Sequence, residues 1–336
     1  MKRTARAMVY TGPGQPLEMR TFPLPELAAG EALVKVRLCT LCGSDLHTYE
    51  GRRTTPMPTI LGHEILGEIA ALPDINPPTD SSGRTLDLGT RVTWTIAASC
   101  GECSKCRRNI PQKCERLFKY GHERLNDEHP LSGGLAEYCH LAAGTTIVVV
   151  PSDVPDQVAC PANCAAATVA GAFRTAGDCR DRTVLVQGLG LLGLTACAYA
   201  RHAGARDVIA TDPSADRCRL AREFGATSIA STPEAMAEAT QAITSGRGVD
   251  VAFEFCGAPE AIEQALPQLA IGARYVLVCA VFPARPAQLS AETIVRRLIR
   301  IEGLHNYTPA DLAAAVQFLA AVHHQVPLAK LVAAPV

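Results

Sequence analysis

The chain has 336 residues, of which 48% are hydrophobic, and a formal net charge of −1 at pH 7. This length favours two domains with separate cores, and the near-zero charge gives no basic field that would favour nucleic acid or an anionic membrane. No apolar run approaches the ~20 residues of a membrane span, and the basic N-terminus lacks the apolar core of a secretory signal. A soluble cytoplasmic protein is therefore expected, and its 14 cysteines are read first as metal ligands.

The first part of the chain reads as short strands joined by turns. Residues 5–40 are rich in turns and end in an apolar–polar alternation, which is typical of partly exposed strands. A further strand is expected at 64–72, followed by a loop at 73–84. Residues 100–116 are rich in cysteine and charge and show neither helical nor strand periodicity. These features predict a sheet that carries an irregular, cysteine-rich loop.

From residue 183 the pattern changes to alternating strands and helices. An apolar strand at 183–187 leads through a glycine turn into an amphipathic helix, and a second strand follows at 207–212, which makes one βαβ unit. Further elements are expected as a helix at 214–224, a strand at 249–255, a helix at 259–270 and a strand at 274–281. Near-continuous apolar strands that alternate with helices predict an α/β fold with a doubly wound parallel sheet.

Gly188, Gly190 and Gly193 form a G-x-G-x-x-G motif between this first strand and its helix. The glycines permit a tight turn, close approach of the backbone to a pyrophosphate and close helix–strand packing, and the helix N-terminus favours an anion. Asp212 follows about 20 residues later, where a carboxylate binds the adenosine ribose. It favours NAD over NADP, although Arg217 could neutralise a 2′-phosphate. A structural glycine turn with a capping aspartate is the weaker alternative.

Four cysteines in the irregular loop have the spacing of a closed metal site. They follow the pattern C-x2-C-x2-C-x7-C, and they are Cys100, Cys103, Cys106 and Cys114. Four thiolates surround one tetrahedral zinc and leave no open position, so the site is expected to be structural. An iron–sulfur cluster is the main alternative.

A second metal site is expected from residues that lie farther apart. Cys42 and His63 are set among turn residues, and PANCAAATVAG offers Cys164 as a third ligand. Three protein ligands with one open position are typical of catalytic zinc. Asp45 is placed to accept the other ring N–H of His63. The remaining cysteines, including Cys39 and Cys160, are read as small buried packing residues.

With these motifs in order, the chain resembles the zinc-dependent medium-chain dehydrogenases/reductases, the alcohol dehydrogenase superfamily. The resemblance runs from about residue 5 to the end and rests on CGSDLH, GHE, the four-cysteine lobe, SGGLAEY, GLGLLG and VDVAFEFCG. It implies a GroES-like β-barrel catalytic domain at 1–152, with the structural zinc lobe at about 98–116. A Rossmann NAD-binding domain at 153–303 and a return segment at 304–336 would follow.

The resemblance also implies residue roles and a reaction. Cys42, His63 and Cys164 would bind catalytic zinc, with Glu64 as a nearby or transient ligand. Ser44 would hydrogen-bond the substrate oxygen and pass its proton outward, with His47 in the relay. The reaction would be hydride transfer between NAD and a small alcohol, or its aldehyde or ketone, in a homodimer or homotetramer. The positions carried over for nicotinamide and pocket contacts are Thr168, Ile96 and Trp94.

The substrate is expected to carry an anion. HTYEGRR, CERLFKYGHE and PANCAAATVA resemble a clade associated with phosphonate catabolism. Arg52 and Arg53 follow the relay histidine, and Lys119 and His122 follow the cysteine lobe. Arginine binds phosphonate, sulfonate or carboxylate through two parallel hydrogen bonds. A solvated arginine pair, with a neutral polyol or secondary alcohol as substrate, is the alternative.

The chain ends at LAKLVAAPV, where the family usually continues through a further helix and strand. This difference leaves a second class of function open, a zinc- and nucleotide-binding protein without efficient catalysis. A zinc-free quinone reductase is disfavoured, because such members lack this set of metal ligands.

Overall fold

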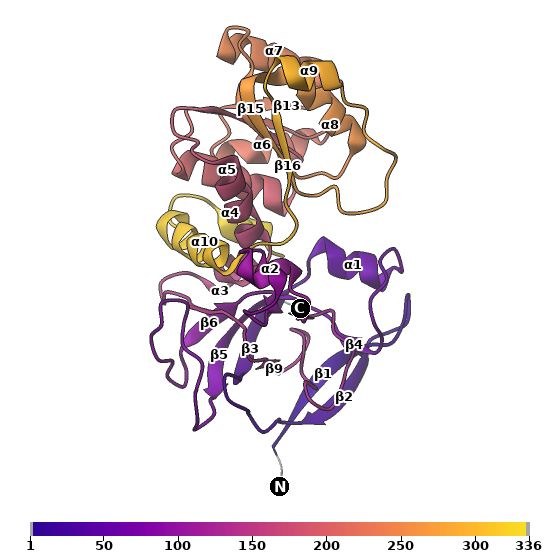
Figure 1. Cartoon of the computed structure of the whole chain (residues 1–336), viewed down its shortest axis with the longest axis vertical. Coiled ribbons are helices and arrows are strands. Elements are labelled where there is room, and N and C mark those ends of the chain that lie inside the picture. Colours follow the sequence, from indigo (N-terminus) through magenta and orange to yellow (C-terminus); the bar gives the residue numbers. More distant parts are fainter. Residues whose placement is uncertain (1–2, 334–336) are drawn as a thin grey trace. The chain divides into compact units, whose positions relative to one another are not determined.

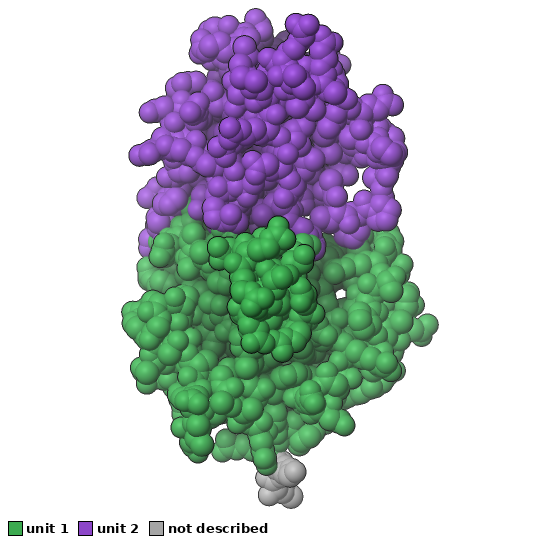
Figure 2. Space-filling model, viewed as in Figure 1, with its two compact units in different colours: residues 1–167, 308–320, 334–336 green, residues 168–307, 321–333 purple. Residues whose placement is uncertain are grey.

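The computed structural model describes residues 3–333, which form two compact units. The first unit contains the described residues up to Ala167 together with Thr308–Ala320, and the second contains Thr168–Tyr307 and Ala321–Ala333 (Figure 2). One boundary between the units falls inside helix α4 (Ala165–Ala176). Within residues 3–333, no helix is long and apolar enough to cross a membrane.

The first unit is built on antiparallel strands (Figure 1). One sheet has the order β10-β6-β5-β3-β9, a second has the order β2-β1-β4, and β7 pairs with β8. The strands are β1 (Thr4–Tyr10), β2 (Glu18–Pro23), β3 (Ala32–Thr40), β4 (Thr59–Ile60), β5 (Glu64–Ala71), β6 (Arg91–Trp94), β7 (Ala97–Ala98), β8 (Phe118–Lys119), β9 (Tyr138–Leu141) and β10 (Ile147–Val149).

Short helices connect or follow these strands, and several of them lie beside candidate metal ligands. The α-helices are α1 (Gly43–Tyr49), α2 (Ser104–Arg107) and α3 (Asp156–Ala159), and the 3₁₀ turns are η1 (Pro111–Lys113) and η2 (Cys160–Asn163). Strand β3 alternates as its sequence predicts, because Val34 is buried while Lys35 and Arg37 are exposed. Val34 packs with Ile65 and Trp94 in the core of this unit.

The second unit is a six-stranded parallel sheet with the order β13-β12-β11-β14-β15-β16 (Figure 1). All five residues of β11 are buried, as expected for a central strand covered by helices on both faces. This sheet confirms the predicted α/β class. The strands are β11 (Thr183–Gln187), β12 (Asp207–Thr211), β13 (Ser228–Ala230), β14 (Val249–Glu254), β15 (Leu269–Leu277) and β16 (Arg300–Gly303).

The helices of the remaining chain follow the predicted alternation, with one difference. The expected helix at 259–270 is divided into α8 (Pro259–Ala265) and the turn η3 (Leu266–Gln268), and β15 begins at Leu269 rather than at residue 274. Pro267 lacks the N–H that would continue the helix. The other elements are α5 (Leu191–His202), α6 (Ala215–Glu223), α7 (Pro233–Thr244), α9 (Ala291–Arg296), α10 (Pro309–Val322) and η4 (Leu328–Leu331).

The core of the second unit contains a polar link that a conservative substitution can test. The Tyr275 hydroxyl donates to Gln187 Oε1 at 2.7 Å, and Gln187 Nε2 donates to the Ala261 carbonyl at 2.8 Å. Tyr275→Phe removes the donor from a buried amide oxygen, so the free energy of unfolding should fall by about 1–3 kcal/mol. Urea unfolding measures it, with Tyr49→Phe on the exposed surface as the control. Equal midpoints for both variants would contradict the prediction.

Candidate functional site

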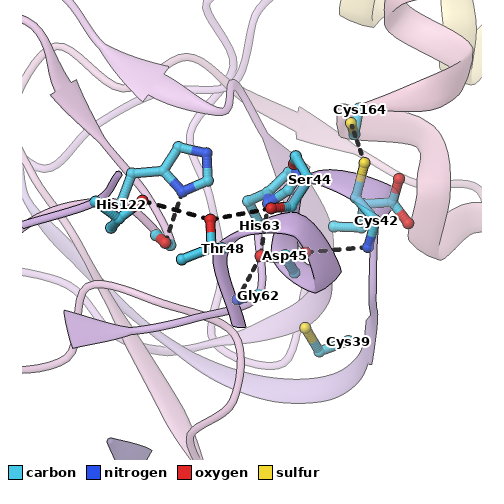
Figure 3. A network of polar contacts seen from close by, with 12 residues as sticks. Cys39, Cys42, Ser44, Asp45, Thr48, Gly62, His63, His122 and Cys164 are labelled. Carbon is cyan, nitrogen blue, oxygen red and sulfur yellow. Dashed lines mark hydrogen bonds and ion pairs between the residues drawn. The ribbon is translucent and has the colours of Figure 1, made fainter. Parts of the chain in front are cut away.

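Asp45 connects two of the predicted zinc ligands (Figure 3). Its Oδ2 accepts the backbone N–H of Cys42 at 3.0 Å, at the start of helix α1. Its Oδ1 accepts the Gly62 N–H at 3.3 Å and lies 3.2 Å from Nδ1 of His63. A carboxylate on one ring nitrogen of a histidine fixes the tautomer and leaves the other nitrogen for a metal. Asp45 therefore fixes the backbone of Cys42 and the ring of His63 at the same time.

Asn163 positions the third predicted ligand, Cys164, close to His63. Its amide Nδ2 donates to the His63 carbonyl at 3.0 Å, and its Oδ1 accepts the Ile65 N–H at 3.1 Å. The next residue is Cys164, whose Sγ lies 3.9 Å from Sγ of Cys42. Zinc–sulfur bonds of about 2.3 Å in a tetrahedron give a sulfur–sulfur separation of about 3.8 Å. One ligand atom each from Cys42, His63 and Cys164 lie within 4.8 Å of one another, so this donor set fits zinc.

The charges at these three residues also fit a cation. The Cys164 thiol and His63 lower the pKa of Cys42 to about 3, so Cys42 is a thiolate at neutral pH. Burial lowers the pKa of His63, but hydrogen bonds to Asp45 and Cys42 outweigh it and raise this pKa to about 10. Burial, followed by the charge of Cys42, raises the pKa of Glu64 to about 7. The imidazole thus carries positive charge among buried acidic groups, where a metal ion would replace its proton.

The predicted relay residues lie on the helix that begins directly after Cys42. Ser44 and His47 are half-buried and three residues apart on α1, so they occupy adjacent turns of one helix. The Thr48 hydroxyl donates to the Ser44 carbonyl at 3.0 Å (Figure 3). Glu64 accepts a 2.6 Å hydrogen bond from the Thr40 hydroxyl. Ser44 and Glu64 therefore lie close in sequence and space to the ligands Cys42 and His63, and His47 lies one turn farther along α1.

Two nearby cysteines have other contacts. The Cys160 thiol donates to the carbonyls of Leu38 and Glu64, each at 3.3 Å. Cys39 lies apart from the ligand atoms of Cys42 and Cys164 in Figure 3, and burial raises its pKa well above the usual range. Cys160 is buried, as the sequence predicts for a packing residue, whereas Cys39 is only half-buried.

The four cysteines of the loop also converge. Sulfur–sulfur distances are 3.4 Å for Cys100–Cys114, 3.5 Å for Cys103–Cys106, 3.8 Å for Cys103–Cys114 and 4.0 Å for Cys100–Cys106. These values bracket the tetrahedral separation of about 3.8 Å expected for zinc thiolate. Backbone N–H groups point at the sulfurs, such as Cys103 N–H at 3.4 Å from Cys100 Sγ. Such donors, first that of Glu102, lower the pKa of Cys100 to about 6.

In the second unit, the glycine motif has the geometry of a phosphate-binding turn. Gly188 has φ = +85°, and a Cβ on Gly193 would lie 1.7 Å from the Gly188 carbonyl oxygen. The first and third glycines are therefore required by the backbone itself. Gly190, which caps α5, has no atom within 4 Å of a would-be Cβ. Its side is open to a ligand, as the motif requires.

Asp212 lies beside this turn at the end of β12. Its two carboxylate oxygens accept the backbone N–H groups of Leu189 at 2.8 Å and Ser214 at 2.9 Å. The Arg217 guanidinium is 3.6 Å from Asp212 Oδ2 and remains largely exposed. Thr168, four residues after Cys164, lies on α4 in the second unit. The structure therefore brings the glycines, Asp212 and Arg217 together.

The predicted substrate residues are placed unequally. Trp94 is fully buried in the core of the first unit, and Ile96 is nearly so. Arg52 pairs with Glu50 and its side chain is 61% exposed. Arg53 is half-buried. The pKa of Lys119 is lowered to about 8, first by the burial of Lys119 itself and second by the positive charge of Arg53. Arg53 is therefore partly buried, like Lys119, whereas Arg52 is exposed at the surface.

Two contacts near the candidate zinc site were not expected from the sequence. Asn163 joins the backbone on both sides of Glu64, and the only signal was a polar residue inside the apolar run PANCAAA. The His122 ring lies 5.0 Å from that of His63, edge to face, and its Nδ1 donates to the Gly121 carbonyl at 2.6 Å (Figure 3). Neither contact could be inferred from spacing.

Comparison with known proteins agrees with this geometry. Residues 28–152 match the alcohol dehydrogenase GroES-like domain, and residues 192–321 match the zinc-binding dehydrogenase model. An L-threonine 3-dehydrogenase of Pyrococcus horikoshii is 32% identical over 89% of this chain and 82% of its own. The crystal structure of an alcohol dehydrogenase from Thermotoga maritima superposes with a TM-score of 0.91, at 29% identity, over 98% of this chain and 91% of that one.

A further structure has a nicotinamide cofactor bound. It is described as a zinc-binding dehydrogenase from Sinorhizobium meliloti bound to NADP, and it has a TM-score of 0.80 and 26% identity over 99% of this chain and 91% of that one. The matches support the fold, because they cover both the GroES-like and the Rossmann parts of the chain.

The role of Asn163 leads to a prediction about metal retention. Asn163→Ala leaves the His63 carbonyl and the Ile65 N–H without a partner in the interior, which should lower stability by about 1–3 kcal/mol. Because Cys164 follows directly, about half of the bound zinc should also be lost on dialysis, while the four-cysteine site keeps its own ion. Elemental analysis measures the zinc, and Gln288→Ala, an exposed amide, is the control. Full zinc content in Asn163→Ala would contradict this role.

Proposed function

The chain belongs to the zinc-dependent alcohol dehydrogenase superfamily, and we propose that it transfers a hydride between NAD and a small alcohol or the corresponding aldehyde or ketone. The observation that carries the proposal is the convergence of Cys42, His63 and Cys164 within 4.8 Å. Two thiolates and one imidazole are a catalytic donor set for zinc, whereas the four-cysteine lobe is a closed, structural set. Two zinc ions per chain are therefore proposed.

The chain's own residues supply the proton chemistry. Zinc, when bound, supplies a Lewis acid that polarises the substrate oxygen. Ser44 is proposed to accept the hydroxyl proton of the alcohol and His47, one turn along α1, to pass it to solvent. Asp45 holds His63 in place. Glu64 is proposed as a nearby carboxylate that binds the zinc transiently. Thr168 is proposed to contact the nicotinamide.

The cofactor is proposed to be NAD. Asp212 is 6% exposed and held by two backbone N–H groups, so its negative charge is fixed where the adenosine ribose would bind. A 2′-phosphate there would meet a like charge, which is unfavourable. Arg217 lies 3.6 Å from the same carboxylate and offsets part of that charge. The Sinorhizobium meliloti structure has NADP bound. Comparing the KM for NAD with the KM for NADP therefore tests the proposed preference for NAD.

The substrate is proposed to be a small hydroxyalkyl compound that carries an anion. Lys119 is half-buried, and burial followed by the charge of Arg53 lowers the pKa of its ammonium, while the charges of the candidate ligands Cys164 and Cys42 raise it. Two partly buried cations near a metal site favour an anionic group on the ligand. The Pyrococcus horikoshii relative is named for L-threonine, a small secondary alcohol with a carboxylate. A phosphonate or sulfonate has the same chemistry.

Other expectations from the sequence stay open beside this proposal. A neutral polyol or secondary alcohol is the alternative substrate, and a zinc- and nucleotide-binding protein without efficient catalysis is the alternative function. Cytoplasmic location and a homodimer or homotetramer remain predictions from the sequence.

Matched cysteine variants test the reaction. Zinc-loaded protein should reduce NAD with at least one small alcohol, and Cys164→Ser should lower kcat/KM by at least about 100-fold, since it removes a zinc ligand. Cys160→Ser is the control, because a serine hydroxyl can still donate to the carbonyls of Leu38 and Glu64. NADH formation at 340 nm is the measurement. Tight NADH binding without turnover of any alcohol would favour the non-catalytic alternative.

Charge variants test the substrate class. Lys119→Gln and Arg53→Gln should each raise KM for a hydroxyalkyl carboxylate or phosphonate by about 10-fold or more, because each loses a charge-assisted hydrogen bond of about 1.5–3 kcal/mol. KM for neutral alcohols of the same length should change less than about twofold. Arg52→Gln is the matched control, since Arg52 pairs with Glu50 at the surface. Equal effects on charged and neutral alcohols would overturn the anionic substrate.

The same cations predict a pH dependence. The pKa of Lys119 is lowered to about 8, so Lys119 is charged below that pH and loses its charge as the pH rises through it. The preference for anionic over neutral alcohols should therefore weaken above about pH 8 in the wild type and less so in Lys119→Gln. A preference ratio that is constant from pH 6 to pH 10 would contradict a role for Lys119.

A further inference from the structure

A third cluster of metal-ligating side chains lies in the first unit, and it contains no cysteine. Glu31 directly precedes β3, His140 lies on β9, and His129 lies in the loop between β8 and β9. Leu33 of β3 pairs with His140 across the two strands, so Glu31, two residues before Leu33, lies on the same face of the sheet as His140. One ligand atom from each of the three residues lies within 4.8 Å of the others.

Glu31 determines which nitrogen of His140 is available. Its Oε2 accepts the Ala28 N–H at 2.9 Å and lies 3.0 Å from Nε2 of His140. The carboxylate therefore holds the proton of His140 on Nε2, which leaves the lone pair on Nδ1. The His140 side chain is 1% exposed, and burial lowers its pKa, so the neutral ring is favoured. A carboxylate, a histidine and a metal in line are a common arrangement at protein metal sites.

The free nitrogen of His140 faces a second imidazole. Its Nδ1 lies 3.3 Å from Nδ1 of His129. Zinc–nitrogen bonds of about 2.0–2.1 Å in a tetrahedron place two nitrogens about 3.3–3.4 Å apart. His129 is held in this position by its backbone N–H, which donates to Asn126 Oδ1 at 2.7 Å, and by the Phe118 ring at 4.8 Å. The spacing fits one ion as well as it fits a hydrogen bond between two neutral rings.

We propose that His129 and His140 bind a divalent transition-metal ion, such as Zn²⁺, through their Nδ1 atoms, with Glu31 orienting His140 and water completing the coordination. The site has two neutral nitrogen donors and no thiolate, so it is weaker and more exchangeable than the two cysteine-containing sites. When the ion binds, His129 carries its proton on Nε2 instead of Nδ1. The inference does not depend on the proposed reaction, because none of these residues belongs to that site.

Occupancy would tie a loop to the sheet. His140 donates its backbone N–H to the Leu131 carbonyl at 2.8 Å, and the ion would add a second link through His129. The same loop carries His122, whose ring contacts that of His63. A bound ion should therefore stabilise the first unit, because a ligand that binds only the folded state raises its stability.

Metal titration of matched histidine variants tests the site. Protein that holds its two tightly bound zinc ions is titrated with Zn²⁺ by calorimetry, and the wild type should bind one further equivalent. His129→Ala should lose this equivalent, and Glu31→Gln should bind it about 10–100-fold more weakly. His324→Ala is the control, because His323 and His324 form another close histidine pair, with ring centroids 3.7 Å apart. Retention of the two tight zinc ions shows that each variant is folded.

Two readouts distinguish this site from adventitious binding. Excess Zn²⁺ should raise the melting temperature of the wild type and of His324→Ala but not that of His129→Ala. With one equivalent of Cu²⁺ added, electron paramagnetic resonance should show two nitrogen donors in the wild type and fewer in His129→Ala. The site is overturned if the wild type binds no further Zn²⁺, if His129→Ala binds it as the wild type does, or if His324→Ala loses it.

Discussion

The buried carboxylate of Asp45 is the constraint on which the candidate catalytic site depends. It binds the backbone N–H groups of Cys42 and Gly62 and lies against the His63 ring, with its side chain only 2% exposed. One side chain thereby sets the position of one ligand and the tautomer of another. The Asn163 amide donates to the His63 carbonyl. The next residue, Cys164, thereby lies with its Sγ 3.9 Å from Sγ of Cys42.

The first unit therefore holds three kinds of donor set, and each has its own chemistry. Four thiolates with backbone N–H donors form a closed donor set that is suited to a structural ion. Two thiolates and an imidazole, next to the acidic Glu64, leave room for a substrate oxygen. Two imidazoles with one orienting carboxylate have neither a thiolate nor a net negative ligand, which is typical of exchangeable sites. The strength of binding is expected to follow this order.

Sequence patterns predict the parts of this molecule that short-range geometry determines. The glycine motif and the four-cysteine loop follow from spacing, because their residues are neighbours in the chain, and the parallel sheet follows from the alternation of apolar strands with helices. Contacts over long separations are different: Asn163 is 100 residues from His63, and His140 is 109 residues from Glu31. Pro267 is a local signal for the early end of α8, which the expected helix at 259–270 overlooked, whereas the partly buried position of Arg53 near Lys119 depends on tertiary partners. No local pattern contains information about such partners.

The most direct test of the central claim is zinc K-edge X-ray absorption on protein dialysed to its tightly bound metal. If Cys42, His63 and Cys164 hold one ion and the four-cysteine loop holds another, the spectrum should give two zinc ions per chain. Their shells should average about three sulfur ligands per zinc, with bonds of about 2.3 Å to sulfur and a clear imidazole contribution. One zinc per chain with four sulfur ligands and no imidazole would contradict the catalytic site.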